Sequence, residues 1–385
     1  MSTMRLFTEE QILIQNMARE FSGNRLTSGA EEREAAGRIE PEIIAEMAEL
    51  GFLGMTTPEE MGGVGADTVS YALALMEIAA GDGSVSTMMS VHNSPFCAVL
   101  ARYGSAEQQI KWLRPAAEGA FIGCFALTEP GTGSDAAAIK TRAVRSNAGY
   151  EITGSKQFIT SGTIGGATVV FAVTDPGAGK KGLSAFFVEQ GTSGFLVAPP
   201  ERKLGQKASD TCALTFEGCP VPAGNLIGEE GQGLAIALSS LESGRIGIAA
   251  QSVGMAQAAL DYAAAYAMER KTFGKAIFDH QAVAFRLAEM DAQIEASRQL
   301  VLNAARLKDL GQPCLREASI AKLIASEMAE TVASQGLQTL GGYGFLADYP
   351  LERIYRDQRV CQIYEGTSDV QKINISRDLQ RRYAP

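Results

Sequence analysis

One acidic residue near the C-terminus lies in an otherwise uncharged segment. Glu365 occurs within Cys361-Gln-Ile-Tyr-Glu-Gly-Thr-Ser368, and a helix is predicted to follow, with Ser368 and Gln371 at the spacing of a capping box. Two interpretations are open. Glu365 is either a solvated side chain favoured by the dipole of that helix, or a general base whose pKa is raised in an apolar pocket. The segment alone favours the solvated side chain, so other residues must decide.

A glycine-rich loop follows the first predicted strand. Residues 131–136, GTGSDA, match the G-x-G-x-x-A pattern of dinucleotide-binding folds, which requires a helix directly after the loop. Residues 140–154 instead alternate as strand, turn and strand, so we reject that fold. Two interpretations remain: an ordinary turn of a β domain, or a loop that binds a ligand through its backbone and the hydroxyls of Thr128 and Ser134.

The composition excludes several classes of protein. The formal net charge is −10 with dispersed Lys and Arg, which argues against nucleic-acid binding. Six cysteines without a C-x-x-C pair, and only two histidines, leave almost no material for a metal site. Free thiols fit a reducing cytoplasm, and no segment approaches the ~20 apolar residues of a membrane span. We expect a cytoplasmic protein that has no metal and does not enter a membrane.

The periodicity divides the 385 residues into three segments, so we expect an α+β protein of three domains. Residues 1–120 read as an N-terminal α-helical domain, in which Thr8 and Gln11 form a capping box and Pro41 opens a helix that stops at Gly51. Further helices are predicted at 68–80 and 88–103, with an interruption at 81–83.

The second and third segments differ from the first. Residues 121–232 are predicted to form a middle antiparallel β domain, because short β-rich stretches follow one another without helices between them. These stretches are 121–129, 140–146, 150–160, 167–175, 183–190 and 212–217. Residues 233–385 are predicted to form a C-terminal domain like a four-helix bundle, with helices at 234–270, 279–310, 313–340 and 367–382. Ala and Gly in the first of these permit close helix–helix approach.

Six motifs in a fixed order resemble those of acyl-CoA dehydrogenases and cover nearly the whole chain. They are ALTEPGTGSD (126–135), KQFITSG (156–162), ESGRIGIAAQSVG (242–254), ERKTFGK (269–275), QTLGGYGF (338–345) and IYEGTSDVQ (363–371). Their wording is most similar to the short-chain and short-branched-chain members, which implies fatty acid metabolism or branched-chain amino acid catabolism. The resemblance also implies the fold of that family, with FAD as cofactor.

The resemblance further implies the roles of single residues. Glu365 matches the catalytic base. The residues that match flavin contacts are Phe125, Leu127, Thr128, Gly133, Ser134, Phe158, Ile159, Thr160, Gln338, Thr339, Leu340, Gly341, Gly342, Thr367, Ser368 and Asp369, while Arg270, Phe273 and Gln281 match contacts to the FAD of a neighbouring subunit in a homotetramer. The residues that match contacts to the acyl-CoA are Ser134, Glu242, Ser243, Gly244, Arg245, Tyr364 and Gly366.

The sequence departs from the pattern of close relatives at two positions. Glu242 stands where Asp is common, and Phe158 stands where Trp is usual. Some relatives carry the base directly before the arginine, but that position is Gly244 here, which supports Glu365. Without the motif, Arg245 would read as a member of an ordinary helix ion pair.

The implied reaction is α,β-dehydrogenation of a short acyl-CoA, straight or branched, to the trans-2-enoyl-CoA. Glu365 would remove the α-proton while flavin N5 accepts the β-hydride, and the backbone N–H of the base and a ribityl hydroxyl would bind the thioester carbonyl. An electron-transfer flavoprotein would accept the electrons. The rival interpretations are a flavin-dependent acyl-CoA oxidase or monooxygenase of the same fold, and a non-catalytic acyl-CoA-binding protein.

Overall fold

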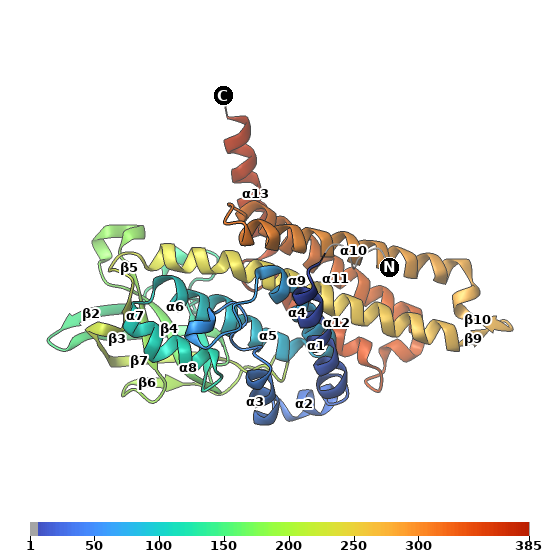
Figure 1. Ribbon diagram of the computed structural model, residues 1–385, viewed down its shortest axis with the longest axis horizontal. Helices are drawn as coiled ribbons and strands as arrows, with labels where there is room; N and C mark the ends of the chain where they lie inside the picture. Colours follow the sequence, from blue (N-terminus) through green and yellow to red (C-terminus); the bar gives the residue numbers. More distant parts are fainter. Residues whose placement is uncertain (1–6, 385) are drawn as a thin grey trace.

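The computed structural model describes residues 7–384. Helices from both ends of the chain lie together in one elongated body, and a β domain occupies one end of its long axis (Figure 1). The N-terminal helices are α1 (Glu9–Phe21), α2 (Ala30–Ala36), α3 (Pro41–Glu49), α4 (Thr68–Gly81), α5 (Gly83–Val91), α6 (Ala98–Tyr103), α7 (Ala106–Gln108) and α8 (Arg114–Ala117). Short π-helical segments join several of them.

Local sequence accounts for the ends of these helices. Thr8 and Gln11 form the expected capping box on α1, and α3 begins at Pro41 and is followed by Gly51 in the left-handed conformation (φ 76°). Asp82 interrupts the helical conformation between α4 and α5, and its carboxylate accepts from the N–H groups of Ser84 and Val85. The helix predicted from residue 88 therefore begins earlier, at Gly83.

The middle of the chain forms an eight-stranded sheet in the order β6-β7-β3-β2-β4-β5-β8, with β1 paired to β4. The strands are β1 (Ile122–Ala126), β2 (Arg142–Ser146), β3 (Gly149–Thr160), β4 (Gly165–Val173), β5 (Leu183–Glu189), β6 (Phe195–Val197), β7 (Thr211–Pro222) and β8 (Leu226–Ile227). Most pairs are antiparallel, as predicted, but β1 and β2 both pair parallel with β4. Sequence analysis missed β6 and β8, because strands of two or three residues show no period.

The sheet is covered on both faces. On one face Phe171 and Phe187 pack with Phe96 and Trp112 from the N-terminal helices, and the rings of Trp112 and Phe187 stack at 3.9 Å. On the other face the strands curve around a core of their own, which includes Phe186 and Phe216. The β domain is therefore fixed to the helices through one face.

The C-terminal region contains four long helices and several shorter elements. They are α9 (Gly233–Glu269), a hairpin of β9 (Lys271–Thr272) and β10 (Lys275–Ala276), α10 (Gln281–Asp309), α11 (Leu315–Leu340), α12 (Pro350–Gln358) and α13 (Ser368–Tyr383). The hairpin and α12 were not predicted. Helix α13 projects from the body (Figure 1). Within residues 7–384 no helix has the length and apolar composition needed to cross a membrane.

Helix α9 passes close to α4 because a glycine stands at their contact. A Cβ at Gly254 would lie 2.0 Å from the carbonyl oxygen of Met76, so no side chain fits there. The surrounding residues of α9, including Ile248 and Val253, belong to one core that the N- and C-terminal helices share. The expected close approach at the Ala- and Gly-rich helix is therefore present.

We predict that Gly254→Ala lowers the free energy of unfolding by about 2 kcal/mol, because the added methyl group forces α9 and α4 apart. Chemical denaturation checks the value. Gly23→Ala is the matched control, since a Cβ there meets nothing within 4 Å, and it should be neutral or slightly stabilising. Equal stability of the two variants would show that the α4–α9 contact tolerates expansion.

Candidate active site

Glu365 occupies a strained loop that turns its carboxylate inward. Its φ is 51° and that of Gly366 is 91°, so two consecutive residues adopt the left-handed conformation. Both carboxylate oxygens are buried and have no hydrogen-bond partner among the described residues. A Cβ at Gly244 would lie 1.6 Å from Glu365 Oε2, so only glycine at that position of α9 leaves room for the carboxylate.

The electrostatic surroundings of Glu365 suit a base. Burial raises the pKa of Glu365 to about 7, while the positive charges of Lys322 and Arg245 act to lower it. Neither cation forms a salt bridge with the carboxylate in residues 7–384. A carboxylate whose pKa is near neutrality can accept a proton from a weak carbon acid and still be ionised at pH 7. The solvated alternative considered from the sequence does not fit this geometry.

Arg245 is a buried cation whose guanidinium has free donors. Its side chain is 4% exposed, and its Nε and Nη1 atoms have no hydrogen-bond partner among the described residues. Burial lowers its pKa, and Glu365 and Glu242 act in the opposite direction. The helix ion pair considered above does not form within the described chain. A buried guanidinium with unpaired N–H groups is suited to a polar or anionic ligand.

The segment after the base is held differently from the prediction. Thr367, not Ser368, is the N-cap of α13, and its hydroxyl accepts from the N–H of Val370 at 3.3 Å. Gln371 donates instead to the carbonyl of Gly366 at 2.8 Å. The predicted Ser368–Gln371 capping box is therefore wrong by one residue. The hydroxyl of Ser368 is buried without a partner in the described structure, while Asp369 is exposed.

Tyr364 connects the base to a buried polar network. Its hydroxyl donates to Gln251 Oε1 and lies 3.4 Å from the hydroxyl of Thr87. Gln251 donates in turn to Thr87 and to Ser86, at 2.6 and 2.7 Å. Its side chain is fully buried. This layer of hydrogen bonds lies two turns along α9 from Gly244.

The two segments expected to face a flavin are adjacent in the β domain. The N–H of Gln157 donates to the carbonyl of Thr128 at 2.9 Å. Leu127 and Ile159 are buried, whereas Phe125, Thr128 and Thr160 are half-buried. The structure therefore brings together the expected residues that follow β1 and those that end β3.

Phe158 is the exposed aromatic residue of this group. It lies at a bulge where the pairing of β3 with β7 shifts register, and its φ is 58°. Its side chain is 65% exposed. A left-handed backbone and an exposed ring are both costly unless another group covers the ring, which suits a planar ligand.

The glycine-rich loop does not lead into a long helix. Gly131 to Ser134 are followed by one short 3-10 turn (Ala136–Ala138) and then by β2. The rejection of the classical dinucleotide-binding fold is confirmed. Gly133 and Ser134 are exposed, next to Thr128.

A buried ion pair under this loop was missed by sequence analysis. Lys156 is 0% exposed and donates to Glu129 Oε1 at 2.9 Å and to the carbonyl of Leu127 at 3.2 Å. Glu129 accepts further from the N–H groups of Lys140 and Thr141, at 2.6 and 2.9 Å. Burial lowers the pKa of Lys156 to about 8, against the effect of Glu129. The pair fixes the backbone that carries Leu127 and Thr128.

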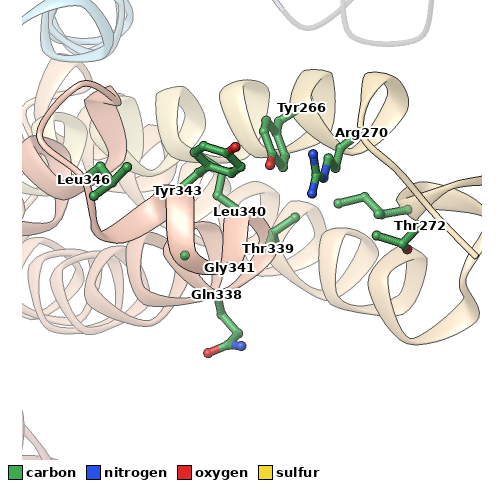
Figure 2. Close-up of a pocket in the computed structure, with 11 residues that line it drawn as sticks. Tyr266, Arg270, Thr272, Gln338, Thr339, Leu340, Gly341, Tyr343 and Leu346 are labelled. Atoms are coloured by element: carbon green, nitrogen blue, oxygen red, sulfur yellow. The ribbon is translucent and has the colours of Figure 1, made fainter.

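A second group of expected cofactor residues lines a cavity of ≈ 420 Å³ at the other end of the helical body (Figure 2). Arg270 lies over the ring of Tyr343 at 5.7 Å, and Figure 2 shows Gln338 pointing away from both. The expected residues that line the cavity are Arg270, Gln338, Thr339, Leu340, Gly341 and Gly342.

Two further residues of this group are not among those that line the cavity. Phe273 is at the tip of the β9–β10 hairpin, 97% exposed with φ 50°, and Gln281 is exposed at the start of α10. The hairpin lies at the opposite end of the long axis from the sheet (Figure 1). Helix α9 connects the two regions, and its 37 residues span about 55 Å. One chain therefore holds the expected cofactor residues in two separate places.

A second cavity, of ≈ 360 Å³, opens between α4, α6 and α9. Tyr71, Ser94, Ser240 and Ser243 line its inner part, and Arg102 and Lys308 bring positive charge to its wall. A Cβ at Gly247, one turn from Gly244, would lie 3.2 Å from the hydroxyl of Tyr71. The cavity thus approaches α9 beside the residues expected to bind substrate. Glu242 lies nearby and accepts from the thiol of Cys314 at 3.4 Å.

Sequence reasoning missed buried residues whose partners are distant in the sequence. Lys156 and Lys322 are the clearest cases, because each is a single lysine within a helix- or strand-forming stretch. KQFITSG contains Lys156, but its partner Glu129 belongs to another motif. The available signal was that Lys156 and Glu129 both lie in motif segments expected to face the flavin.

We predict that Lys156→Met lowers the free energy of unfolding by about 3 kcal/mol, because it leaves the Glu129 carboxylate buried without its cation. Denaturation of the purified protein checks this. The double variant Lys156→Met/Glu129→Gln should recover part of the loss. Lys111→Met removes a charge from an exposed position and is the control. Equal stability of all three variants would mean that the loop does not depend on the ion pair.

Comparison with known proteins identifies the family. The profiles of the acyl-CoA dehydrogenase C-terminal, N-terminal and middle domains match residues 231–380, 8–120 and 124–219. The short-chain specific acyl-CoA dehydrogenase of Clostridium acetobutylicum is 43% identical, over 97% of this chain and 99% of the relative.

Solved structures agree with this assignment. Butyryl-CoA dehydrogenase of Megasphaera elsdenii has a TM-score of 0.95 at 40% identity, covering 97% of this chain and 99% of its own. A chain from the structural study of the electron transferring flavoprotein of Acidaminococcus fermentans has a TM-score of 0.96 at 44% identity, with the same coverage. The α–β–α fold and the resemblance drawn from six motifs are confirmed: this chain belongs to the acyl-CoA dehydrogenase family.

Proposed function

We propose that this protein is an FAD-dependent acyl-CoA dehydrogenase that converts a short acyl-CoA to its trans-2-enoyl-CoA with Glu365 as the base. The observation that carries the proposal is the buried carboxylate of Glu365, which has no partner in the described chain and a pKa of about 7. A non-catalytic acyl-CoA-binding protein would have no use for a strained loop that keeps such a carboxylate unpaired.

The proton step follows from the position of Glu365. Its ionised form takes the α-proton of the thioester, and the absence of a competing hydrogen-bond donor keeps it basic. Negative charge then develops on the thioester oxygen. The N–H of Glu365 donates no backbone hydrogen bond within the described residues, so it is available to that oxygen as one donor of an oxyanion hole.

The residues present fit FAD. Phe158 and Phe273 expose aromatic rings on left-handed backbone, and the ≈ 420 Å³ cavity that Thr272 helps to line offers Arg270 and the backbone of Gly341 and Gly342. Thr128, Ser134 and Thr160 provide hydroxyls on the Phe158 side, and Thr367, Ser368 and Asp369 provide polar groups beside the base. When bound, FAD supplies the acceptor for the β-hydrogen.

The cavity between α4, α6 and α9 supports a short acyl chain. Its serines and its cations, Arg102 and Lys308, suit the polar and anionic arm of CoA. Beyond Gly244 and Gly247, the fully buried Gln251 and its hydrogen bonds to Thr87 and Tyr364 fill the space. A longer acyl chain would have to break these bonds. We therefore infer a substrate with few carbons beyond the β-position, straight or branched.

The remaining assignments rest on the family and on composition. We propose an electron-transfer flavoprotein as electron acceptor, since one of the similar structures comes from a study of such a protein. Six free, buried cysteines support a reducing compartment such as the cytoplasm. We take 1–120, 121–232 and 233–385 as the domain boundaries.

An anaerobic absorbance spectrum tests the function. We expect an oxidised flavin band that bleaches on addition of butyryl-CoA or a short branched acyl-CoA, and much less with long acyl chains. A flavin band that no acyl-CoA bleaches, or a colourless protein, would contradict the proposal. Rapid reoxidation in air with release of peroxide would instead favour the oxidase.

The pH dependence and a variant test the base. Because Glu365 must be ionised to accept a proton, kcat/KM should rise with pH and level off above about pH 7. Glu365→Gln should still bind flavin and acyl-CoA, but the rate of flavin reduction should fall by roughly 1,000-fold or more. Near-normal reduction in this variant would remove the assignment of Glu365.

We propose further that each flavin site is shared between two chains of a homotetramer, because β3, which carries Phe158, and the β9–β10 hairpin, which carries Phe273, lie at opposite ends of the long axis (Figure 1). Phe158→Ser and Phe273→Ser should each reduce the flavin content. Chains of the two variants, coexpressed with different tags and purified as mixed oligomers, should regain flavin in part. In a mixed pair of chains, one flavin site contains both substituted residues, and the other contains the native Phe158 of one chain and the native Phe273 of the other. Mixed oligomers as poor in flavin as either variant alone would contradict a shared site.

A further inference from the structure

Lys322, on α11, is a buried cation that the proposed chemistry does not yet use. Its side chain is 0% exposed. Its Nζ donates to the carbonyl oxygen of Gly366, the residue after the base, at 2.7 Å. No carboxylate of the described chain forms a salt bridge with it, and burial lowers its pKa to about 8. A buried ammonium is costly to the fold, so its contact with the loop of Glu365 needs a reason.

The contact fixes the peptide group between Gly366 and Thr367, one residue beyond the base. The Gly366 carbonyl accepts from Lys322 and also from Gln371 Nε2, at 2.7 and 2.8 Å. Two donors on one carbonyl determine the direction of that peptide plane. Since Glu365 and Gly366 both have positive φ, the loop adopts a conformation that an unrestrained chain would leave. Lys322 thus acts on the position of the carboxylate as well as on its charge.

The charged and titratable groups around Glu365 come from four parts of the chain. They are Glu242 and Arg245 on α9, Lys322 on α11, Tyr71 on α4, and Cys361 and Tyr364 in its own segment. Of these, Lys322 and Arg245 act to lower the pKa of Glu365, against the effect of burial. Arg245 is expected to bind substrate, whereas Lys322 is enclosed behind the loop and is bonded to protein.

We propose that Lys322 is a positioning residue for the base: its buried ammonium holds the Gly366 carbonyl and so keeps both the loop of Glu365 and a positive charge in place. The inference rests on the proposed function of Glu365. Lys322 has two separate effects. Its hydrogen bond orients the loop of Glu365, and its positive charge favours the carboxylate form of Glu365. The two effects predict different changes in a pH profile.

Three substitutions at this position separate the effects. Lys322→Met removes charge and donor, Lys322→Gln removes the charge and keeps a donor, and Lys322→Arg keeps both. Without the cation the pKa of Glu365 rises further, so in the Met and Gln variants the rising limb of flavin reduction by butyryl-CoA should move up by about one pH unit. At pH 6 the rate should then fall about tenfold. In Lys322→Arg the rising limb should lie at the wild-type pH. At high pH the rate of flavin reduction should be lower in Lys322→Met than in Lys322→Gln, because only Gln keeps a hydrogen-bond donor.

The controls distinguish positioning from general damage. Flavin content and the melting temperature verify that each variant is folded, and Lys111→Met, which removes the same charge from an exposed position, should leave the profile unchanged. If Lys322→Met does not accumulate as a flavoprotein, Lys322→Gln carries the test of the charge. If Lys322→Met and Lys322→Gln are folded and the rising limb of their flavin reduction lies at the same pH as in the wild type, the proposal is overturned.

A second readout is independent of turnover. Infrared difference spectra of the carboxyl stretch, assigned by its loss in Glu365→Gln, give the pH at which Glu365 ionises in the absence of any thioester. This pH should be about one unit higher in Lys322→Gln than in the wild type, and the same pH in both would overturn the proposal. Failure of every acyl-CoA to bleach the wild-type flavin would refute the proposed function only, since the infrared titration still reports on Lys322.

Discussion

The structure depends on burying one carboxylate without pairing it. Glu365 lies against α9 where Gly244 has no Cβ, and both its oxygens are buried without a hydrogen bond from the described chain. Burial of a charge is among the largest costs in a protein, so several elements must cooperate to maintain it. The glycine on α9, the left-handed loop and the donors on the Gly366 carbonyl each restrict an alternative position of the side chain.

The two nearby cations balance that cost without cancelling the basicity of Glu365. A direct salt bridge with Arg245 or Lys322 would stabilise the carboxylate so strongly that it became a poor base. At longer range the same charges only moderate the effect of burial, which leaves the pKa of Glu365 near 7. The pKa values of Lys322 and Arg245 are themselves lowered by burial. The site is therefore a group of three buried charges, in which the carboxylate stabilises both cations and offsets their mutual repulsion in part.

Sequence reasoning reached the fold and the base because both have local signatures. The capping box at Thr8, the stop at Gly51 and the alternation in the β segments are properties of short windows, and the structure contains them. The parallel direction of β1 could not be predicted from the sequence. Its partner β4 is about 40 residues away, and the side chains of parallel and antiparallel strands alternate with the same two-residue period. The Lys156–Glu129 pair and the contact of Lys322 with Gly366 were not predicted for the same reason. The two members of each contact are far apart in the sequence, by 27 and 44 residues.

Backbone strain reveals what sequence patterns could not. Within residues 7–384, five residues other than glycine have positive φ: Phe158, Ser161, Gln206, Phe273 and Glu365. Three of them are proposed to contact flavin or substrate. Ser161 follows the Phe158 bulge, and Gln206 accepts from the Thr87 hydroxyl that also binds Gln251. None belongs to a residue type that favours this conformation, so no turn rule predicts it. Because such strain persists only where the surroundings enforce it, its concentration around the base and the exposed rings argues that these positions were selected for their chemistry and not for stability.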